Sequence, residues 1–500
     1  MAIPALWDKC LSYREVQVFC TVAVGLHLLA LILADHFYID DSWRSQLADS
    51  GWTAEGRVLL DWLYAGLSFS DAAPNLFPLP LLIAGTAAAL ALARLARHYF
   101  VTPSASAVLV VLPLWYNPFF LQNLSYQYDG PGMALSLAAS VLAITLEPRC
   151  WRNLAYGAAL VAVAMSFYQI SLNLFAGLCC VEVIRQVLLG ADLGQTLRHA
   201  LGRATQLLGG CLFYALSAFQ LMTPLRTKLL DVDGHWLTNI GQRLAVVTER
   251  VGLLITPGTI GFTLALSSLA GIALLAAALR VIRGKGNLAA RLGVLLALLL
   301  PVPLILLLVP GMTLLFDDFN DGARTLMALS VPMVLVLLLV HRLLGRMHQR
   351  LCWVLLIPLL SMLSFAFAYG RVLVMQKELQ QAVTFSLAHD INARSALASA
   401  PRLYVLDIGS SEQWLPAASG SMQAMPALRY VLNIDFLLLP EMMPRVGVSN
   451  FGSRVPLDRQ AVLARSPTPL VDSKFYSIHM VDGSGYVMMK TPLDPENFRW

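Results

Sequence analysis

Two adjacent carboxylates, Asp40 and Asp41, follow the first long apolar run of this 500-residue chain. Arg44 and Arg57 lie a short distance further along the same polar stretch. A close pair of carboxylates can supply a general base and its partner, and arginine binds phosphate with two parallel hydrogen bonds. The spacing therefore predicts proton transfer beside a bound phosphate. The alternative is that an Asp-Asp pair in a loop is simply solvated.

Three further polar clusters interrupt otherwise apolar sequence. They span residues 123–131, 166–173 and 317–324, and they contain Tyr126, Asp129, Tyr168, Gln169 and Arg324. Polar groups near membrane depth are costly and are commonly functional. We therefore expect these clusters to share one site with the Asp-Asp loop. Glu182, in contrast, has Arg185 one helical turn further on, which favours a local ion pair.

The composition shows which environment must hold this site. Hydrophobic residues make up 57% of the chain and charged residues 13%, with a mean hydropathy of +0.66. Soluble proteins carry roughly 25% charged residues, so a soluble enzyme is excluded, and so is a disordered chain. The net charge of +5 is scattered, which excludes a nucleic-acid-binding protein. The chain is therefore predicted to be an integral membrane protein.

Apolar runs near the length needed to cross a bilayer predict about eleven transmembrane helices. They lie at 16–35, 77–94, 104–121, 132–146, 154–167, 170–189, 205–222, 252–279, 292–310, 325–341 and 351–370. The border between the fifth and the sixth rests on the polar interruption at 166–169.

Positive charges orient these helices. With eleven spans, the basic clusters all fall on one side, for example Arg94, Arg97, Arg149, Arg152, Arg342 and Arg346. This pattern predicts a cytoplasmic N-terminus and a C-terminus outside the cytoplasm. The first span is too long for the apolar core of a signal peptide and is expected to stay as an anchor.

Two parts of the chain are predicted: a transmembrane domain at 1–375 and a more charged extracytoplasmic α/β domain at 376–500. The first external loop, 36–76, includes an expected interfacial amphipathic helix at 54–69, with Arg57 and Asp61 paired. In the second part, 379–400 has helical spacing, 402–408 reads as a strand, and 475–480 and 486–490 form a hairpin around 482–485.

Several of these motifs together resemble a known family. The string Asp40-Asp41-Ser-Trp-Arg44, with Gly56-Arg57, resembles the first external loop of the Gtr-type (type II) O-antigen glucosyltransferases of bacteria and phages, which underlie serotype conversion. The segments at 124–129 and 166–171 are similar to later motifs of that family. The resemblance covers about 30 to 330 and implies a GT-C fold.

The resemblance also implies a reaction. The donor would be a polyprenyl-phosphate-linked sugar, such as glucose, and the acceptor a surface glycan such as lipid-linked O-antigen. The chemistry would take place on the periplasmic side of a bacterial inner membrane. The enzyme would work downstream of a polyprenyl-phosphate glucosyltransferase and a flippase.

Within that reaction the resemblance implies a role for each candidate residue. Related GT-C enzymes use the first acid of such a pair as the base, which implies Asp40 as base for inverting transfer and Asp41 as its orienting or charge-tuning partner. Phosphate binding is expected from Arg44, Arg57 and Arg324. Contacts to donor or acceptor sugars are expected from Tyr126, Asp129, Tyr168 and Gln169.

Two questions stay open at the level of sequence. The three acids Asp40, Asp41 and Asp129 could ligate a divalent metal, although we favour a reaction without metal or other cofactor. A lipid-linked glycan flippase or an O-antigen polymerase is the alternative function. Charges gathered at one face, away from the bilayer midplane, favour the transferase over a transporter.

Overall fold

The computed structural model describes residues 9–223, 228–284, 287–411 and 413–492. Within these ranges the chain is mostly helical, and eight helical segments are long and apolar enough to cross a membrane. They are Tyr13–Ala34 (α1), Leu79–Tyr99 (α4), Ser171–Leu188 (α10), Leu193–Leu221 (beginning with α11, Leu193–Ala215), Ile260–Arg283 (α13), Leu288–Leu307 (α14, Leu288–Leu299, and α15, Pro301–Leu307), Ala323–Met347 (ending with α16, Ser330–Met347) and Gln349–Asn392 (ending with α17, Leu356–Asn392). Each coincides with an expected span.

The three other expected spans fall on shorter helices. Residues 104–121 form broken pieces, namely α5 (Ala105–Leu109), α6 (Pro113–Tyr116) and the start of α7 (Phe120–Ser125). The remaining two are α8 (Gly130–Thr145) and α9 (Trp151–Phe167). Proline at 113 and 118 explains the first break, because proline cannot donate a helical hydrogen bond. Short helices are tolerated at membrane depth where protein covers them, and almost every residue from 105 to 144 is buried.

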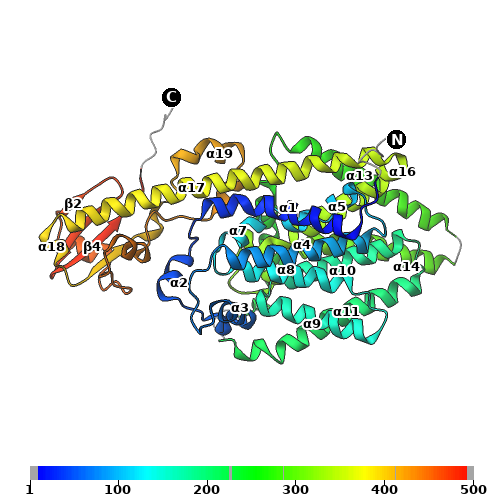
Figure 1. Cartoon of the computed structure of the whole chain (residues 1–500), viewed down its shortest axis with the longest axis horizontal. Helices are drawn as coiled ribbons and strands as arrows, with labels where there is room; N and C mark the ends of the chain where they lie inside the picture. The colour runs from blue at the N-terminus through cyan, green and yellow to red at the C-terminus, as the bar shows by residue number, and fades with distance from the viewer. Residues whose placement is uncertain (1–8, 224–227, 285–286, 412, 493–500) are drawn as a thin grey trace.

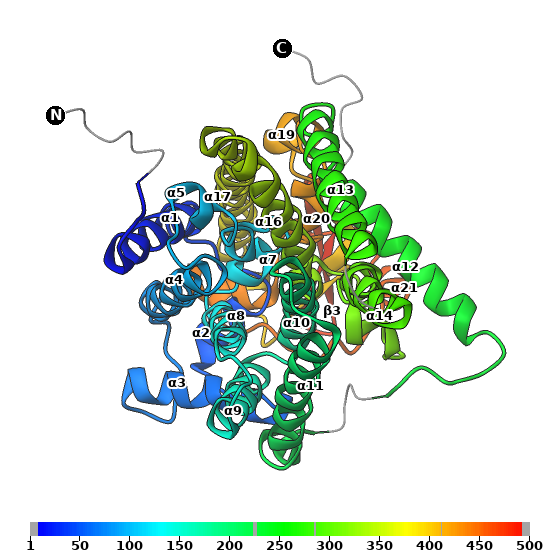
Figure 2. The ribbon, with the colours of Figure 1, turned by 90° about the vertical axis from the view of Figure 1, so that its right-hand side faces the viewer.

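Helix α8 lies inside the bundle and packs against α4, α9 and α10. Its sequence is rich in glycine, alanine and serine, whose small side chains let neighbouring backbones approach closely. Figure 2 shows α1 and α4 on one flank of the bundle and α13 and α14 on the other. Helix α12 (Trp236–Gly252), which has no counterpart among the expected spans, lies at the periphery.

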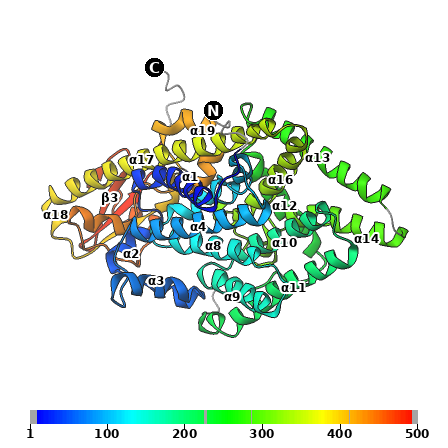
Figure 3. The same ribbon diagram turned by 45° about the vertical axis from the view of Figure 1, so that its right-hand side comes forward.

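The first polar loop and the C-terminal segment lie at the same end of the long axis, with the start of α1 at the other end (Figure 1). The loop contains α2 (Asp41–Leu47), the short 3-10 helix η1 (Trp52–Glu55) and α3 (Val58–Ser68). Figure 3 shows α3 on the side of the molecule away from α17. The amphipathic helix expected at 54–69 thus exists from Val58 onward, with Trp62 66% exposed.

The expected pair between Arg57 and Asp61 is wrong. The chain folds back at η1, so Asp61 accepts hydrogen bonds from the backbone N–H groups of Trp52 and Thr53. Arg57 precedes the helix and points elsewhere, as described below. Tertiary contacts therefore replace the local helical pair.

The C-terminal segment carries a four-stranded sheet in the order β1-β4-β3-β2. Its strands are β1 (Leu403–Leu406), β2 (Val471–Asp472), β3 (Tyr476–Val481) and β4 (Ser484–Met489); β1 is parallel to β4 and the other pairs are antiparallel. The expected hairpin is confirmed, with Asp482 and Gly483 both at positive φ in its two-residue turn. The expected strand at 402–408 is confirmed as β1.

Short helices complete the segment: α18 (Ser395–Ala398), α19 (Ser419–Ala424), α20 (Ala427–Leu432), the 3-10 helix η9 (Pro440–Val446) and α21 (Arg459–Arg465). The helix expected at 379–400 is mostly the end of α17. This helix runs without interruption from Leu356 to Asn392, across the predicted boundary at 375/376.

Candidate active site

Asp41 is fully buried at the start of α2. Its carboxylate accepts hydrogen bonds from the backbone N–H groups of Tyr38 at 2.8 Å, Gln127 at 2.9 Å and Tyr128 at 3.2 Å. Burial raises the pKa of Asp41 to about 8, against the opposing effect of these N–H donors. Asp41 therefore ties the first loop to the segment before α8, and both of its oxygens are engaged.

Asp40, one residue earlier, has a different environment. It is partly exposed, and the indole Nε1 of Trp43 donates to it over a long 3.5 Å. Within the described ranges no backbone N–H and no basic side chain binds this carboxylate. Of the adjacent pair, Asp40 is thus the one whose lone pairs are open to accept a proton.

Asp129 lies at the N-terminus of α8 and is 5% exposed. It receives hydrogen bonds from Arg57 Nη1 at 2.8 Å and Trp52 Nε1 at 3.1 Å. Arg44 lies 3.6 Å from its other oxygen and is itself buried, with its guanidinium 4.4 Å from the Trp52 ring. The two loop arginines thus surround a carboxylate that joins the loop to the bundle.

Arg324 has no such partner. Its Nη1 donates to the Tyr126 hydroxyl at 2.7 Å, and across the described ranges no carboxylate lies within ion-pair distance of its guanidinium. Its backbone carbonyl accepts from Tyr168 at 3.3 Å and from Asn123 at 3.1 Å. The backbone is therefore fixed while the positive charge stays uncompensated.

Tyr168 and Gln169 occupy the break between α9 and α10, which confirms the interruption expected there. The Arg57 guanidinium lies over the Tyr168 ring, 5.3 Å from its centroid. Gln169 Nε2 donates to the Glu55 carbonyl at 2.7 Å and to the Tyr214 hydroxyl at 2.9 Å. This break thereby holds the loop from a second side.

The structure brings together the residues that the sequence analysis selected. Direct contacts link Arg44, Arg57, Asp129 and Tyr168, and Arg324 joins Tyr126 to Tyr168. Asp41, Gln169 and Asp40 reach this group through neighbouring residues: Tyr128, Glu55 and Trp43 respectively.

Other members of the site were missed. Trp52 is fully buried between Asp129, Arg44 and the stacked ring of Tyr64. Gln122 accepts from the backbone N–H of Arg324 and donates to the Tyr38 hydroxyl. An aromatic residue in the acidic loop is the one signal that could have pointed to Trp52; nothing in the spacing distinguishes Gln122.

The three acids of the site do not form an open set of metal ligands. Asp41 is engaged by three backbone N–H groups, and Asp129 Oδ1 by Arg57 and Trp52. Asp129 Oδ2 makes no hydrogen bond within the described ranges but is buried beside Arg44, which leaves Asp40 as the accessible acid with open lone pairs. A metal site needs several converging lone pairs. The geometry therefore favours acid–base chemistry at Asp40 over metal ligation.

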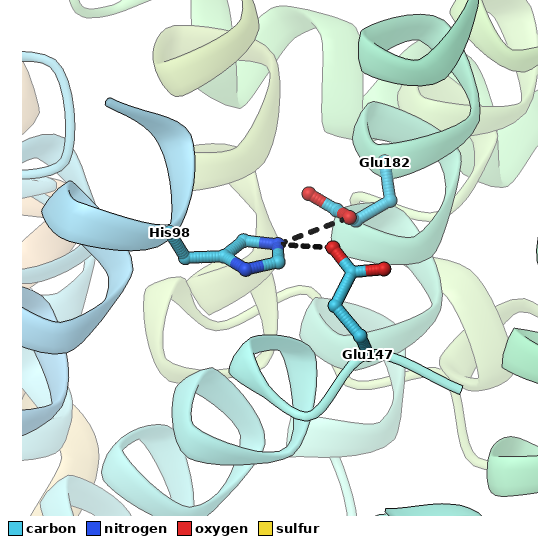
Figure 4. Close-up of side chains that lie close together, drawn as sticks. All are labelled: His98, Glu147 and Glu182. Atoms are coloured by element: carbon cyan, nitrogen blue, oxygen red, sulfur yellow. Dashed lines mark ion pairs between the residues drawn. The ribbon is translucent and has the colours of Figure 1, made fainter. Parts of the chain in front are cut away.

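A second cluster of ionisable groups lies at the other end of α8, about 24 Å along its axis by helical rise. His98, Glu147 and Glu182 point toward one another there (Figure 4). Arg185 Nη2 lies 3.1 Å from His98 Nε2, 3.2 Å from Glu147 and 3.0 Å from Glu182, so a guanidinium fills the space between these ligand-like atoms. The expected pair of Glu182 with Arg185 is confirmed, and the cluster is an ion-pair network.

Comparison with known proteins places the chain among its relatives. A model of the family described as glucosyl transferase GtrII matches residues 29–387, which contain every site residue named above. A Salmonella phage P22 protein, described as an uncharacterized 55.3 kDa protein in the gtrB 5' region, is 28% identical over 210 residues. That match spans 41% of this chain and 42% of the phage protein. No solved structure matches. The family match covers most of the chain, which therefore belongs to the glucosyl transferase GtrII family.

Proposed function

We propose that this chain transfers a single glucose from a polyprenyl-phosphate donor to lipid-linked O-antigen on the periplasmic side of the inner membrane. Membership of the family implies an enzyme that glucosylates O-antigen, and so a sugar donor and a glycan acceptor. The polyprenyl carrier, the side of the membrane and inversion at the anomeric carbon are the proposal's own. They rest on the resemblance to the Gtr-type enzymes, and the charge pattern and the site support them.

The proposed mechanism depends on a difference in burial and hydrogen bonding among three carboxylates. Asp41 and Asp129 are buried and engaged, whereas Asp40 is partly exposed and weakly bonded. A general base needs a free lone pair within reach of the hydroxyl it activates. Asp40 would take the proton of the acceptor hydroxyl, and that oxygen would bond to the anomeric carbon from the face opposite the phosphate.

The leaving group requires a cation. As the bond between the anomeric carbon and the phosphate oxygen breaks, negative charge grows on the departing polyprenyl phosphate. Arg324 has an uncompensated guanidinium beside Tyr126, and a fixed charge of this kind stabilises the transition state. Burial raises the pKa of the Tyr126 hydroxyl, and the neighbouring charge of Arg324 lowers it.

The remaining site residues would hold this arrangement in place. Arg44 and Arg57 are engaged with Asp129, so we assign them first to shaping the loop and only second to binding phosphate. Asp41 fixes the backbone next to Asp40. Precise positioning of reacting groups accounts for a large part of enzymatic rate enhancement.

Access from the bilayer supports a lipid-linked donor. Helix α3 presents Trp62 and the following Phe69 to the outside, 66% and 95% exposed, next to the polar site. Amphipathic helices with exposed aromatic side chains lie in the membrane interface. A donor dissolved in the membrane would meet the site at that level.

The test uses the purified full chain in lipid nanodiscs with polyprenyl-phosphate glucose and lipid-linked O-antigen. The proposal predicts that the acceptor gains the mass of one hexose and that Asp40→Asn abolishes this gain. Asp49→Asn, which changes an exposed acid of the same loop, is the matched control and should retain activity. Lipid movement without bond formation would instead indicate a flippase, and addition of a whole repeat unit a polymerase; either result contradicts the proposal.

A further inference from the structure

A cavity of about 230 Å³ opens between three segments that are far apart in the sequence. Its walls come from the first loop, from the part of α17 beyond residue 376, and from η9 of the C-terminal segment. We call it the α17 pocket and define it by His36, Phe37, Ser42, Gln380, Phe385 and Arg445. None of these residues has a role in the reaction proposed above.

Two buried polar groups in the α17 pocket lack partners. Gln380 is 4% exposed, and its Nε2 makes no hydrogen bond within the described structure. His36 is 6% exposed, and the same holds for its Nε2. Buried polar atoms in folded proteins are nearly always hydrogen-bonded, and an orphaned one costs about 1–3 kcal/mol. Both residues line the α17 pocket, so its wall contains hydrogen-bonding groups that the protein itself does not use.

Most charges around the α17 pocket are compensated within the protein. Lys377 is taken up by Asp35, whose backbone carbonyl and carboxylate lie 2.7 Å and 3.4 Å from its Nζ. Burial, with the charges of Lys377 and Arg445, lowers the pKa of His36 to about 3, so its imidazole is neutral at physiological pH. One guanidinium, that of Arg445, then faces the cavity.

Two phenylalanine rings, those of Phe37 and Phe385, line the α17 pocket beside these polar groups. The Arg445 guanidinium lies 3.7 Å from the centre of the Phe37 ring, and Phe385 exposes 62% of its surface at the edge of the pocket. Flat apolar surfaces beside amide, imidazole, hydroxyl and guanidinium groups match a sugar ring, which has apolar C–H faces and a rim of hydroxyls. Pockets for drug-sized ligands measure roughly 300–1,000 Å³, so this smaller cavity suits a single monosaccharide.

We propose that the α17 pocket binds one hexose residue of the acceptor glycan. Ser42 lines the pocket two residues from Asp40, so a glycan held there would extend its neighbouring sugar toward the base. This inference rests on the proposed function for its choice of ligand. In this proposal, α17 and η9 position the acceptor glycan relative to Asp40 before transfer.

The test compares Gln380→Leu and Arg445→Ala with the wild-type chain in nanodiscs, and uses Arg454→Ala as control. Arg454 is an exposed arginine of the same C-terminal segment outside the pocket. Loss of one hydrogen bond to a bound hydroxyl should raise the KM for the acceptor about tenfold. The KM for the donor and kcat should stay within about twofold of wild type, because the pocket does not touch the reacting atoms. Arg445 is itself exposed, so its replacement should leave folding intact even where Gln380→Leu does not.

A second readout separates this inference from the proposed function. The probe is the delipidated O-antigen repeat unit, whose binding to the full chain is followed by saturation-transfer NMR. Binding that Arg445→Ala weakens supports the pocket even where the wild-type chain transfers no glucose, a result that would refute only the proposed function. Active transfer with an unchanged acceptor KM in both variants, or a rise in the donor KM alone, overturns the pocket assignment.

Discussion

Replacing Asp40 and Asp41 one at a time separates catalysis from positioning. The two side chains are adjacent and chemically identical, yet one is partly exposed and the other fully buried. Asp40→Ala removes a carboxylate whose hydrogen bond to Trp43 is 3.5 Å long and therefore weak. Asp41→Ala removes the acceptor of three backbone hydrogen bonds.

The expected magnitudes differ accordingly. Each buried donor left without a partner costs about 1–3 kcal/mol, so Asp41→Ala should lower the free energy of unfolding by about 3 kcal/mol or more. Asp40→Ala should change it by about 0.5 kcal/mol or less, as for most substitutions at accessible sites. Both variants should lose transfer activity, Asp40→Ala through the missing base and Asp41→Ala through the displaced loop.

The assay is a denaturant titration of the purified chain in mixed micelles, run beside the transfer assay. Limited proteolysis of the loop at 36–76 supplies an independent readout, because loss of the Asp41 contacts should expose it. An Asp41→Ala variant as stable as wild type but inactive would refute the positioning role. A destabilisation of several kcal/mol in Asp40→Ala would refute our description of that carboxylate as free.

Four further outcomes are expected. The raised pKa of Asp41, about 8 against an ordinary 3.8, means that the folded chain retains a proton that the unfolded chain has lost, so stability should fall as pH rises from about 4 through 8; Asp41→Asn should flatten this profile in denaturant titrations. Arg324→Ala should raise the KM for the lipid donor about tenfold with little effect on the KM for the acceptor, and an unchanged donor KM would exclude the phosphate contact. Gly370→Ala would place a Cβ 2.6 Å from a backbone oxygen of α1, so its thermal unfolding should show a loss of about 1–3 kcal/mol. Glu182→Gln would leave the buried Arg203 without a counter-charge and Arg185 with Glu147 alone, and should cost about 3–5 kcal/mol, measured in the same way.

Features that depend on neighbouring residues could be predicted from the sequence. The polar interruption at 166–169 marked the break between α9 and α10, and Asp-Gly between alternating residues marked the β3–β4 hairpin. The clustering of polar segments in an apolar chain also indicated which residues would meet. These features can be read from the sequence because local backbone preferences and the cost of polar groups at membrane depth act over a few residues.

The partners of individual side chains could not be predicted in the same way. Asp41 binds a backbone 86 positions away, and Arg57 binds a carboxylate 72 positions away in place of its helical neighbour. Such contacts depend on how the loop docks, which no local pattern encodes. Helix α12 was missed because its sequence alternates apolar and polar residues and has no continuous apolar run. It lies at the surface, where only Val247 among its residues is buried.

Helix α17 is longer than a bilayer is thick. Its 37 residues extend about 55 Å, whereas the hydrocarbon of a bilayer is about 30 Å thick. In the proposed topology, roughly 25 Å of uninterrupted helix therefore projects from the membrane and carries the sheet. The position of the apolar part of α17 in the bilayer fixes the height of the sheet above the lipid. Because the Tyr38 hydroxyl of the first loop donates to the Leu432 carbonyl, a thicker or thinner bilayer would shift the C-terminal segment and the first loop together.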